Sequence, residues 1–572
     1  MGHSPADTGG TTTDVLVVGA GPVGLSAAAE LRRRGVRCRL VDRLPARLPY
    51  AKAVGIQPRT LELWDRMGLV RDVLEAAVPL RGQLIYADGR ERARIELSLP
   101  PEVPYGFAAL PQYETERLLE AYVAGLGTSI ERGTELLSFT QDPDGVTARL
   151  RTASGADEEL RVRYLIGCDG AHSVVRKTLG LSYEGGAFPE TYMLGDVEAD
   201  WDLPPGYGLR SSGPSPDGAG DDLLVCIPLP GTGRYRMSMK APSASAAADR
   251  AGDGVAHGLE GGTGPALDDL QAVVDRLAPR PTRLSALRWS SVFRISHRIV
   301  DRYGEGRVFV AGDAAHIHPP VGAQGMNTGV QDACNLAWKL ALVVRGEAGP
   351  ALLTSYDGER RPVGEEVVGR TVRHAVQGMD TGPDQRRTLM LREAQLLVGY
   401  RDGPLSGAPY GPDEAPQPGD RAPDCAGLTT PVAVYPLRLL DVLRGRAGHV
   451  VLLYGADAAT LVRAADATRA AGDLPPLAVL ARDAPDGVPS GASVPVYRDA
   501  AGEFARLYLP DDATGFVVRP DGQLGARFPI GATTTALSDY LRSLSVPLRP
   551  RTVLRDPVVA RDGDHDLELD AR

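Results

Sequence analysis

The sequence predicts an α/β protein in three parts: a domain built from βαβ units, an antiparallel sheet inserted into that domain, and a second α/β domain at the C-terminal end. Three observations predict this class. A glycine fingerprint directly follows a buried strand near the N-terminus, short β-prone runs fill residues 186–290, and a Gly- and Pro-rich stretch at 402–417 precedes a last set of apolar runs.

The charge, hydropathy and cysteine content limit the kinds of partner that the protein is expected to bind. The chain has 572 residues and a formal net charge of −10, which disfavours nucleic acid or an anionic membrane as a partner. No apolar run approaches the roughly 20 residues that span a bilayer, and the N-terminal stretch has no apolar signal core. The five cysteines form no C-x-x-C pair, so neither a disulfide framework nor a zinc site is indicated. We therefore expect a cytoplasmic protein, monomeric or homodimeric, with no bound metal.

The first βαβ unit carries the most specific local pattern, G-x-G-x-x-G, formed by Gly19, Gly21 and Gly24. The first two glycines permit a tight turn and the close approach of a pyrophosphate, while Gly24 lets helix and strand pack together. Asp42 is placed to accept hydrogen bonds from a ribose. The unit predicts dinucleotide binding but does not separate FAD from NAD. Its expected elements are a strand at 14–19, a helix from Pro22 to about Arg34 and a strand at 36–42.

The middle of the chain reads as a helix, a hairpin and a sheet. A helix is expected from about Pro58 to Met67, and the alternation at 134–166 predicts a hairpin with its turn at 142–145. Residues 186–290 read as an antiparallel sheet. Its β-prone runs are separated by low-complexity loops at 211–222 and 241–264, the second of which we expect to be disordered.

A second strand–loop–helix unit lies at 307–346. The strand is expected to end at Ala311, a loop rich in Pro and Gly follows, and apolar residues at three- and four-residue steps predict a helix from about Asn327 to Arg345. Free N–H groups at the start of such a helix favour negative charge. The pair His316 and His318 lacks a third ligand nearby in sequence, so we expect it to pack against the loop rather than to bind metal.

Three motifs together resemble the signatures of a known family. Residues 312–340, GDAAHIHPPVGAQGMNTGVQDACNLAWKL, closely resemble the second FAD-binding signature of the single-component flavoprotein aromatic hydroxylases. These include para-hydroxybenzoate and phenol hydroxylases and the polyketide-tailoring hydroxylases of actinobacteria. CDGAHSVVR at 168–176 matches the family's D-G-x-x-S-x-x-R signature, and the glycine fingerprint precedes both in the family's order. The resemblance covers roughly residues 14–400.

The resemblance implies non-covalent FAD as cofactor and NADPH as a transient co-substrate. In the family, the Asp at position 313 binds the ribityl chain, and the loop at 325–327 places N–H groups beside the N1/C2-carbonyl edge of the flavin. Asp169 is expected near the pyrophosphate, in a segment also implicated in NADPH contact. No catalytic residue is implied. The expected cofactor-binding residues are Gly19, Gly21, Pro22, Gly24, Asp42, Arg43, Lys52, Gln112, Leu136, Asp169, Gly312, Asp313, Pro320, Gly325, Met326 and Asn327.

The phrase PQPGDRAPD at 416–424 resembles the opening of the thioredoxin-like domain appended to many of these hydroxylases. Because the chain has no C-x-x-C, thioredoxin-type redox chemistry is excluded and the domain is expected to be structural. R-P-D-G at 519–522 reads as a turn. The expected organisation is a disordered terminus at 1–13, a Rossmann-like FAD-binding domain at 14–185 and 291–401, an antiparallel-sheet substrate domain at 186–290, a linker at 402–417, a thioredoxin-like α/β domain at 418–555 and an acidic tail at 556–572.

The function that the resemblance implies is monooxygenation of a small aromatic substrate. NADPH reduces the flavin, O₂ adds at C4a, and the resulting hydroperoxide hydroxylates a phenolic, polyketide-type ring. Two alternatives stay open: a Baeyer–Villiger oxygenase on the same scaffold, and a flavin-bound helper that holds an unstable intermediate without oxygenating it. We expect a chain truncated near residue 415 to keep a flavin-binding core.

Overall fold

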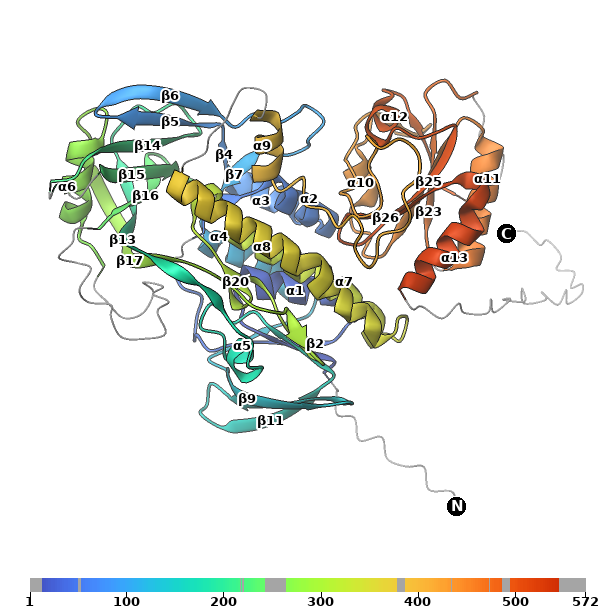
Figure 1. The fold of residues 1–572 in the computed structure, drawn as a ribbon, viewed down its shortest axis with the longest axis horizontal. Coiled ribbons are helices and arrows are strands. Elements are labelled where there is room, and N and C mark those ends of the chain that lie inside the picture. Colours follow the sequence, from blue (N-terminus) through green and yellow to red (C-terminus); the bar gives the residue numbers. More distant parts are fainter. Residues whose placement is uncertain are drawn as a thin grey trace, which may run out of the picture.

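Five β-sheets and the helices around them make up the described parts of the computed structural model (Figure 1). The structure describes residues 13–49, 53–216, 218, 221–241, 264–377, 386–433, 435–472, 474–485 and 494–544. Most of the segments expected to be disordered, at 1–13, 241–264 and 556–572, lie outside these ranges. Of the helices within them, none is both long and apolar enough to cross a membrane.

A six-stranded sheet forms the centre of the first domain. Its order is β18-β19-β12-β1-β2-β8, and all neighbours pair in parallel except β18 with β19. The helix after the glycine fingerprint, α1, ends at Arg32, two residues earlier than expected. The strands are β1 (Val15–Val18), β2 (Cys38–Asp42), β8 (Ile130–Arg132), β12 (Tyr164–Gly167), β18 (Gly304–Glu305) and β19 (Val308–Val310), and the helices of this region are α1 (Pro22–Arg32), α2 (Pro58–Met67), α3 (Val70–Ala76), α4 (Gln112–Gly125) and α5 (Val174–Thr178).

The expected hairpin at 134–166 has a third strand. β9 (Glu135–Asp142) and β10 (Gly145–Arg151) pair around the expected turn, and β11 (Asp157–Val162) extends them into a three-stranded antiparallel sheet. A second small sheet, β3-β7-β4, consists of β3 (Gly55–Ile56), β7 (Phe107–Ala109) and β4 (Val78–Leu80).

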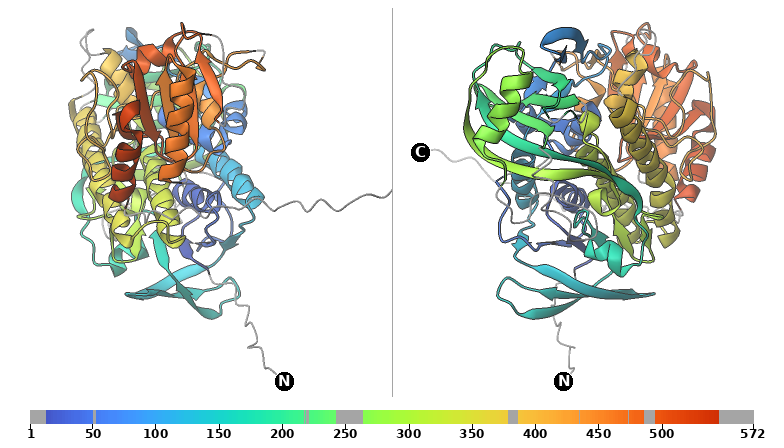
Figure 2. Two further views of the ribbon diagram at one scale, coloured as in Figure 1. Left: turned by 90° about the vertical axis from the view of Figure 1, so that its right-hand side faces the viewer. Right: turned by 60° about the vertical axis from the view of Figure 1, so that its left-hand side comes forward.

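The inserted sheet is larger than the sequence indicated. It has eight strands in the order β20-β17-β13-β16-β15-β14-β5-β6, so strands from before residue 186 and after residue 290 belong to it. All neighbours pair antiparallel except β14 with β5. Helix α6 (Leu267–Leu277) covers one face with its apolar side (Figure 2). The strands are β5 (Gly82–Ala87), β6 (Arg90–Glu96), β13 (Glu184–Ala199), β14 (Tyr207–Pro214), β15 (Asp221–Pro228), β16 (Arg234–Lys240), β17 (Leu284–Ile299) and β20 (His316–Ile317).

One helix, α7 (Gly325–Val344), carries the second half of the second signature, and two more helices follow it. Helix α7 packs against α1, and α8 (Thr354–Gln377) runs across the front of the view in Figure 1. The short helix α9 (Arg386–Glu393) comes next. Helix α7 begins two residues before the expected start, and 16 of its 20 residues are buried, so it lies at the centre of the molecule rather than on its surface.

The C-terminal domain is a six-stranded sheet, β21-β24-β23-β22-β25-β26, with helices on it. β22, β23 and β24 pair in parallel, and β25 and β26 add an antiparallel hairpin. The elements are β21 (Leu428–Thr429), α10 (Leu439–Leu443), β22 (Val450–Gly455), α11 (Ala458–Ala471), β23 (Pro476–Leu480), β24 (Val496–Asp499), α12 (Glu503–Tyr508), β25 (Ala513–Val518), β26 (Leu524–Pro529) and α13 (Thr533–Ser543).

This domain is joined to the first by buried ions rather than held loosely by the linker. The turn between β25 and β26 inserts between α7 and α8, where the Arg519 guanidinium contacts both carboxylate oxygens of Glu359 at 2.7 and 2.8 Å and Asp521 at 2.6 Å. Asp521 also accepts hydrogen bonds from Trp338 and Asn335. Because Arg519 and Glu359 are fully buried, the turn that the sequence predicts at 519–522 is part of the core.

Candidate functional site

The three sequence signatures meet at one edge of the central sheet. β1, β12 and β19 lie side by side in parallel, with Val18 opposite Gly167 and Gly167 opposite Val310. Each signature begins directly after one of these strands. The carboxyl edge of such a sheet is where α/β folds bind ligands, so residues about 290 positions apart in sequence form one site.

The glycine fingerprint shows which positions face other backbone and which face open space. A Cβ at Gly24 would lie 1.8 Å from the Gly19 carbonyl oxygen, and one at Gly19 would lie 2.3 Å from the Cys168 oxygen. Gly19 also has a φ of +97°. At Gly21, by contrast, an added Cβ would meet nothing within 4 Å. Gly19 and Gly24 are therefore needed for packing, while Gly21 borders space that a phosphate could fill.

Asp42 is fixed at the end of β2. Its carboxylate accepts hydrogen bonds from the Ala20 N–H at 2.7 Å and the Leu44 N–H at 2.8 Å, and Arg132 lies 3.4 Å away. These contacts orient the carboxylate beside the glycine turn, where the sequence expected a ribose. Arg43, the next residue, is exposed.

The second signature brings Gly312 and Asp313 to the same edge. Gly312 has a φ of +60°, and a Cβ on it would meet the Val23 side chain at 2.8 Å, so only glycine lets this turn approach α1. Asp313 lies exposed in the following 3₁₀ turn. Its backbone oxygen accepts a hydrogen bond from the Tyr183 hydroxyl at 2.9 Å.

Asp169 has a structural role that the sequence did not reveal. Its carboxylate accepts hydrogen bonds from the Ser173 hydroxyl at 2.6 Å and from the backbone N–H groups of Val174 and Val175. It therefore caps α5, and burial raises its pKa. The expected contact of this segment with the pyrophosphate stays a prediction, and the backbone is the part of Asp169 best placed to make it.

Four further residues that the sequence predicted to bind the cofactor, Leu136, Gln112, Pro320 and Lys52, differ in their surroundings. The Leu136 side chain is buried in the core, so a cofactor contact there would have to come from its backbone. Gln112 begins α4 and donates a hydrogen bond to Glu116 at 2.8 Å; burial raises the pKa of Glu116 to about 7. Pro320 is exposed. Lys52 lies outside the described residues.

The start of α7 presents unpaired backbone donors. The first N–H groups of a helix have no intrahelical acceptor, and α7 has no side-chain cap. Gly325 and Met326 are half-buried in this first turn. Asn327 is fully buried, and its amide donates to the Gly55 oxygen and accepts from the Gln57 N–H, both at 2.9 Å. Asn327 thus ties β3 to α7, and only its N–H remains for a ligand.

A charged cluster that the sequence did not predict supports this turn. Asp332 on α7 binds His316 at 2.7 Å and Arg360 at 2.8 Å, and it accepts a hydrogen bond from the Gly312 N–H at 3.2 Å. Burial opposes ionisation, but Arg360 and His316 hold the pKa of Asp332 below its ordinary value. His318, in contrast, is neutral at pH 7 because burial lowers its pKa to about 4.

The two histidines therefore have different surroundings. Across the ranges that the structure describes, no three His, Cys, Asp or Glu side chains are grouped to hold a metal ion.

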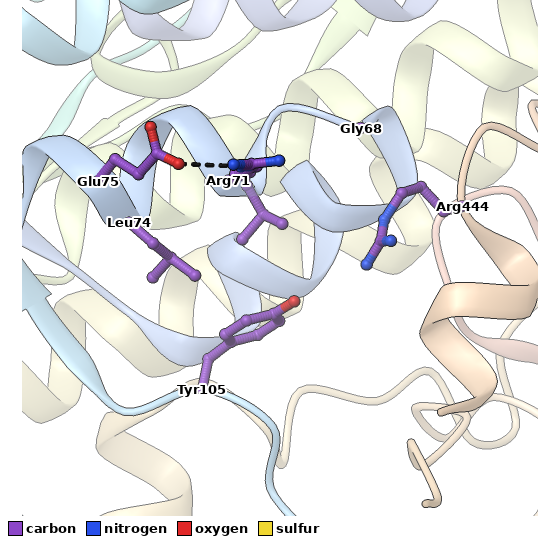
Figure 3. Close-up of a pocket in the computed structure, with 7 residues that line it drawn as sticks. Gly68, Arg71, Leu74, Glu75, Tyr105 and Arg444 are labelled. Atoms are coloured by element: carbon purple, nitrogen blue, oxygen red, sulfur yellow. Dashed lines mark hydrogen bonds and ion pairs between the residues drawn. The ribbon is translucent and has the colours of Figure 1, made fainter. Parts of the chain in front are cut away.

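A surface hollow of about 540 Å³ lies at the junction of α3 with the C-terminal domain (Figure 3). It is lined by Tyr105, Leu74 and Arg444 among others and includes no residue of the three signatures, so we do not assign the cofactor to it.

The donor set at the sheet edge fits a dinucleotide. Both α1 and α7 begin at this edge without a side-chain cap. Two uncapped helix N-termini, an open position at Gly21 and the carboxylate of Asp42 suit a pyrophosphate and a ribose. A family model described as the FAD binding domain matches residues 12–371.

The chain belongs to this FAD-binding family. FAD is accordingly its cofactor, which decides between the two dinucleotides that the first βαβ unit left open.

Known relatives of this FAD-binding chain are similar along most of its length. It is 36% identical over 468 residues to a flavin-dependent monooxygenase of Mycobacteroides abscessus, which covers 78% of the chain and 89% of the relative. It is 38% identical over 416 residues to 6-methylpretetramide 4-monooxygenase of Streptomyces rimosus, covering 68% of the chain and 71% of the relative. The crystal structure of aklavinone-11 hydroxylase with FAD and aklavinone superposes with a TM-score of 0.71 at 28% identity, over 93% of the chain and 99% of that protein.

Proposed function

We propose that this chain is an FAD-dependent monooxygenase that uses NADPH and O₂ to hydroxylate an aromatic, phenolic polyketide. The convergence of the three signatures at one sheet edge, beside an uncapped α7, is the observation that carries the proposal. The relatives described above, which include a 6-methylpretetramide monooxygenase and an aklavinone hydroxylase, support the substrate class. The balance is substrate–H + NADPH + H⁺ + O₂ giving substrate–OH + NADP⁺ + H₂O.

When bound, FAD supplies the chemistry: it accepts electrons from NADPH and activates O₂. The protein binds and orients it. Gly21 would leave space for the pyrophosphate, Asp42 would accept hydrogen bonds from a ribose, and Asp313 would hold the ribityl chain. The N–H groups of Gly325 and Met326 would stabilise negative charge at the N1/C2-carbonyl edge of the flavin.

The face of the eight-stranded sheet opposite α6 is the proposed substrate surface. Residues alternate between faces along a strand, and Met193 and Cys226 pack toward α6. Their neighbours therefore face the opposite side. Ile227 on that side packs with Val54 and Ala109 of the first domain, so the face looks toward the FAD-binding half of the molecule.

This face offers aromatic and apolar contacts beside a buried ion pair. Tyr192 and Phe293 are paired across β13 and β17 with ring centroids 6.0 Å apart. The buried ion pair of Asp196 and Arg236 lies on the same face, and the Trp289 indole donates to Asp196 at 2.9 Å. Flat aromatic rings pack favourably on such surfaces, and the ion pair can orient a phenolic hydroxyl.

We further propose a division into an FAD-binding domain at 14–185 and 291–401, a substrate domain at 186–290 and a thioredoxin-like domain at 418–555, in which β5, β6 and β20 from the FAD-binding part complete the sheet of the substrate domain. The parallel strands β22 to β24 followed by the β25–β26 hairpin and a terminal helix support the last assignment. Cys425 is the only cysteine of that domain, so its role is structural.

The test measures NADPH consumption with and without polycyclic phenols and weighs the products by mass spectrometry. We expect flavin reduction to be faster with the true substrate and the product to gain one oxygen as a phenol. A lactone product would instead favour Baeyer–Villiger oxygenation. Tight ligand binding without reduction or product would favour a helper that does not oxygenate.

A further inference from the structure

Loop 321–324, which precedes α7, has an unusual backbone. Gly322 has a φ of +72° and Ala323 a φ of +53°, so two successive residues adopt the left-handed conformation and one of them is not glycine. Such a conformation persists only where surrounding contacts determine it. The loop is therefore held by its neighbours rather than by its own preference.

Buried amides hold the loop's carbonyl groups. The Gln57 amide donates to the Gly322 oxygen at 2.5 Å, and Asn327 donates to the Ala323 oxygen at 2.8 Å. The Gln324 side chain, which is fully buried, also donates to the Gly322 oxygen, at 2.9 Å. Because these carbonyls point into the protein, the following N–H groups at the start of α7 are left for a ligand.

Gln324 is in turn held by the segment after α9. Its amide nitrogen lies 3.1 Å from a Glu393 carboxylate oxygen, and its amide oxygen accepts from the Gln395 side chain at 2.8 Å. Gln395 also donates to the Thr328 hydroxyl at 3.0 Å and accepts from Gln331 at 2.5 Å. It is 2% exposed and itself has a φ of +58°. We call Glu393 and Gln395 the latch.

The latch is itself anchored on two sides. The Glu393 carboxylate pairs with Arg370 of α8, and a Cβ on Gly322 would lie 2.3 Å from a Glu393 oxygen, which shows how closely the carboxylate packs on the loop. The Ala394 oxygen accepts from the Arg59 N–H at 3.2 Å, at the first turn of α2. The latch therefore connects the loop to α8 and to α2.

We propose that Glu393 and Gln395 are positioning residues: they fix loop 321–324 and the first turn of α7 and thereby set how strongly the protein binds FAD and, above all, reduced FAD. This inference rests on the proposed placement of the flavin's N1/C2-carbonyl edge at that turn. That edge becomes negative on reduction, so loosening the N–H groups weakens binding of the reduced form more than of the oxidised form.

The test uses full-length, FAD-loaded protein. Gln395→Met keeps the side-chain length but removes its hydrogen bonds, and Glu393→Gln removes the charge. Glu366→Gln is the matched control, because Glu366 also pairs with Arg370, at 3.2 Å, but is half exposed and does not contact the loop. The readouts are the Kd of FAD, the two-electron midpoint potential of the bound flavin, and the thermal midpoint of the apoprotein.

We expect both latch variants to raise the Kd of oxidised FAD several-fold and that of reduced FAD at least tenfold more, while the control stays at wild-type values. A tenfold larger loss for the reduced form lowers the potential by about 30 mV. If either variant does not fold, Gln331→Met, which removes one hydrogen bond to Gln395, replaces it.

Variants that fold and keep the wild-type Kd and potential would overturn the proposal. So would variants with a lower thermal midpoint but an unchanged potential, since that is the result of a merely structural role. None of these readouts needs NADPH or substrate. A wild-type protein that binds FAD but hydroxylates nothing would therefore refute the proposed function, while the Kd and potential of the latch variants could still be interpreted.

Discussion

Replacing Arg519 with Met should destabilise the whole protein, because it removes the cation between two buried carboxylates. Arg519 is fully buried, and it contacts both Glu359 and Asp521 through two nitrogens. Lys339, 2.8 Å from Glu359, would be the one remaining cation in direct contact with that carboxylate among the described residues. Removing one partner of a buried ion pair typically costs about 3–5 kcal/mol of unfolding free energy.

The assay is urea-induced unfolding of the FAD-loaded protein, followed by circular dichroism. With an m-value of about 3 kcal/mol per molar urea, a loss of this size lowers the midpoint by about 1–1.7 M. Arg542→Ala is the matched control: Arg542 pairs with Asp539 on α13, but both side chains are largely exposed, and the midpoint should not change. A second variant, Arg519→Met with Glu359→Met, should lose less than the sum of the two single losses.

An Arg519→Met protein that unfolds at the wild-type urea concentration would refute this reasoning. It would mean that the C-terminal domain is held by apolar contacts alone.

The same network changes what we expect of a chain truncated near residue 415. The sequence suggested a surviving flavin-binding core, but truncation would remove Arg519 from Glu359 and leave the Trp338 indole without its partner Asp521, so we now expect a chain that does not fold stably.

Further outcomes follow from the site. Gly21→Ala should fold but bind FAD at least tenfold more weakly, because its Cβ enters the space proposed for phosphate. Gly24→Ala should fail to fold, because its Cβ would lie 1.8 Å from a backbone oxygen. Near-normal FAD affinity in Gly21→Ala would contradict the proposed phosphate position. Asp313→Ala and Asp42→Ala should each weaken FAD binding by about 1.5–3 kcal/mol, measured by fluorescence of released FAD; unchanged affinity in both would refute their proposed contacts. Because the pKa of Glu116 is raised to about 7, the folded protein binds more protons at this site than the unfolded chain, and the free energy of unfolding falls as pH rises from about 4.5 to 7. Glu116→Gln should remove this loss, on the order of 3 kcal/mol, in thermal unfolding at pH 8 but change stability little at pH 4.5. Equal effects at both pH values would count against the pKa shift.

Local patterns predicted the parts of the fold that depend on nearby residues. β1, α1 and β2 have their expected order with ends within two residues, because a buried apolar run and fixed glycines determine them locally. The three signatures also meet at one sheet edge. What the sequence did not reveal are contacts between distant segments, such as Arg360 with Asp332 and the latch with Gln324.

The turn at 519–522 shows why such contacts were missed. Arg, Pro, Asp and Gly in succession are typical of a solvated hairpin turn, and the apolar run at 516–518 before them predicts a buried strand but not a buried turn. In the structure Arg519 is 0% and Asp521 5% exposed. Their partners come from α7 and α8, about 160 to 186 residues earlier. An Arg and an Asp at a turn therefore do not show whether the turn is exposed or buried. Burial depends on a third charged partner, here Glu359, which only the tertiary structure brings near.

Helix α7 connects these observations. Its first turn carries the N–H groups proposed to face the flavin, Asp332 lies two turns later, and Asn335 and Trp338 further along donate hydrogen bonds to Asp521 in the C-terminal turn. A helix that only covered the sheet would bury one apolar stripe. α7 instead buries polar groups along most of its length, and these groups pair with several distant segments of the chain. Its position is thus determined by the C-terminal domain at one end and by the latch at the other, which explains why a domain without redox cysteines is built into the core of an FAD-binding protein.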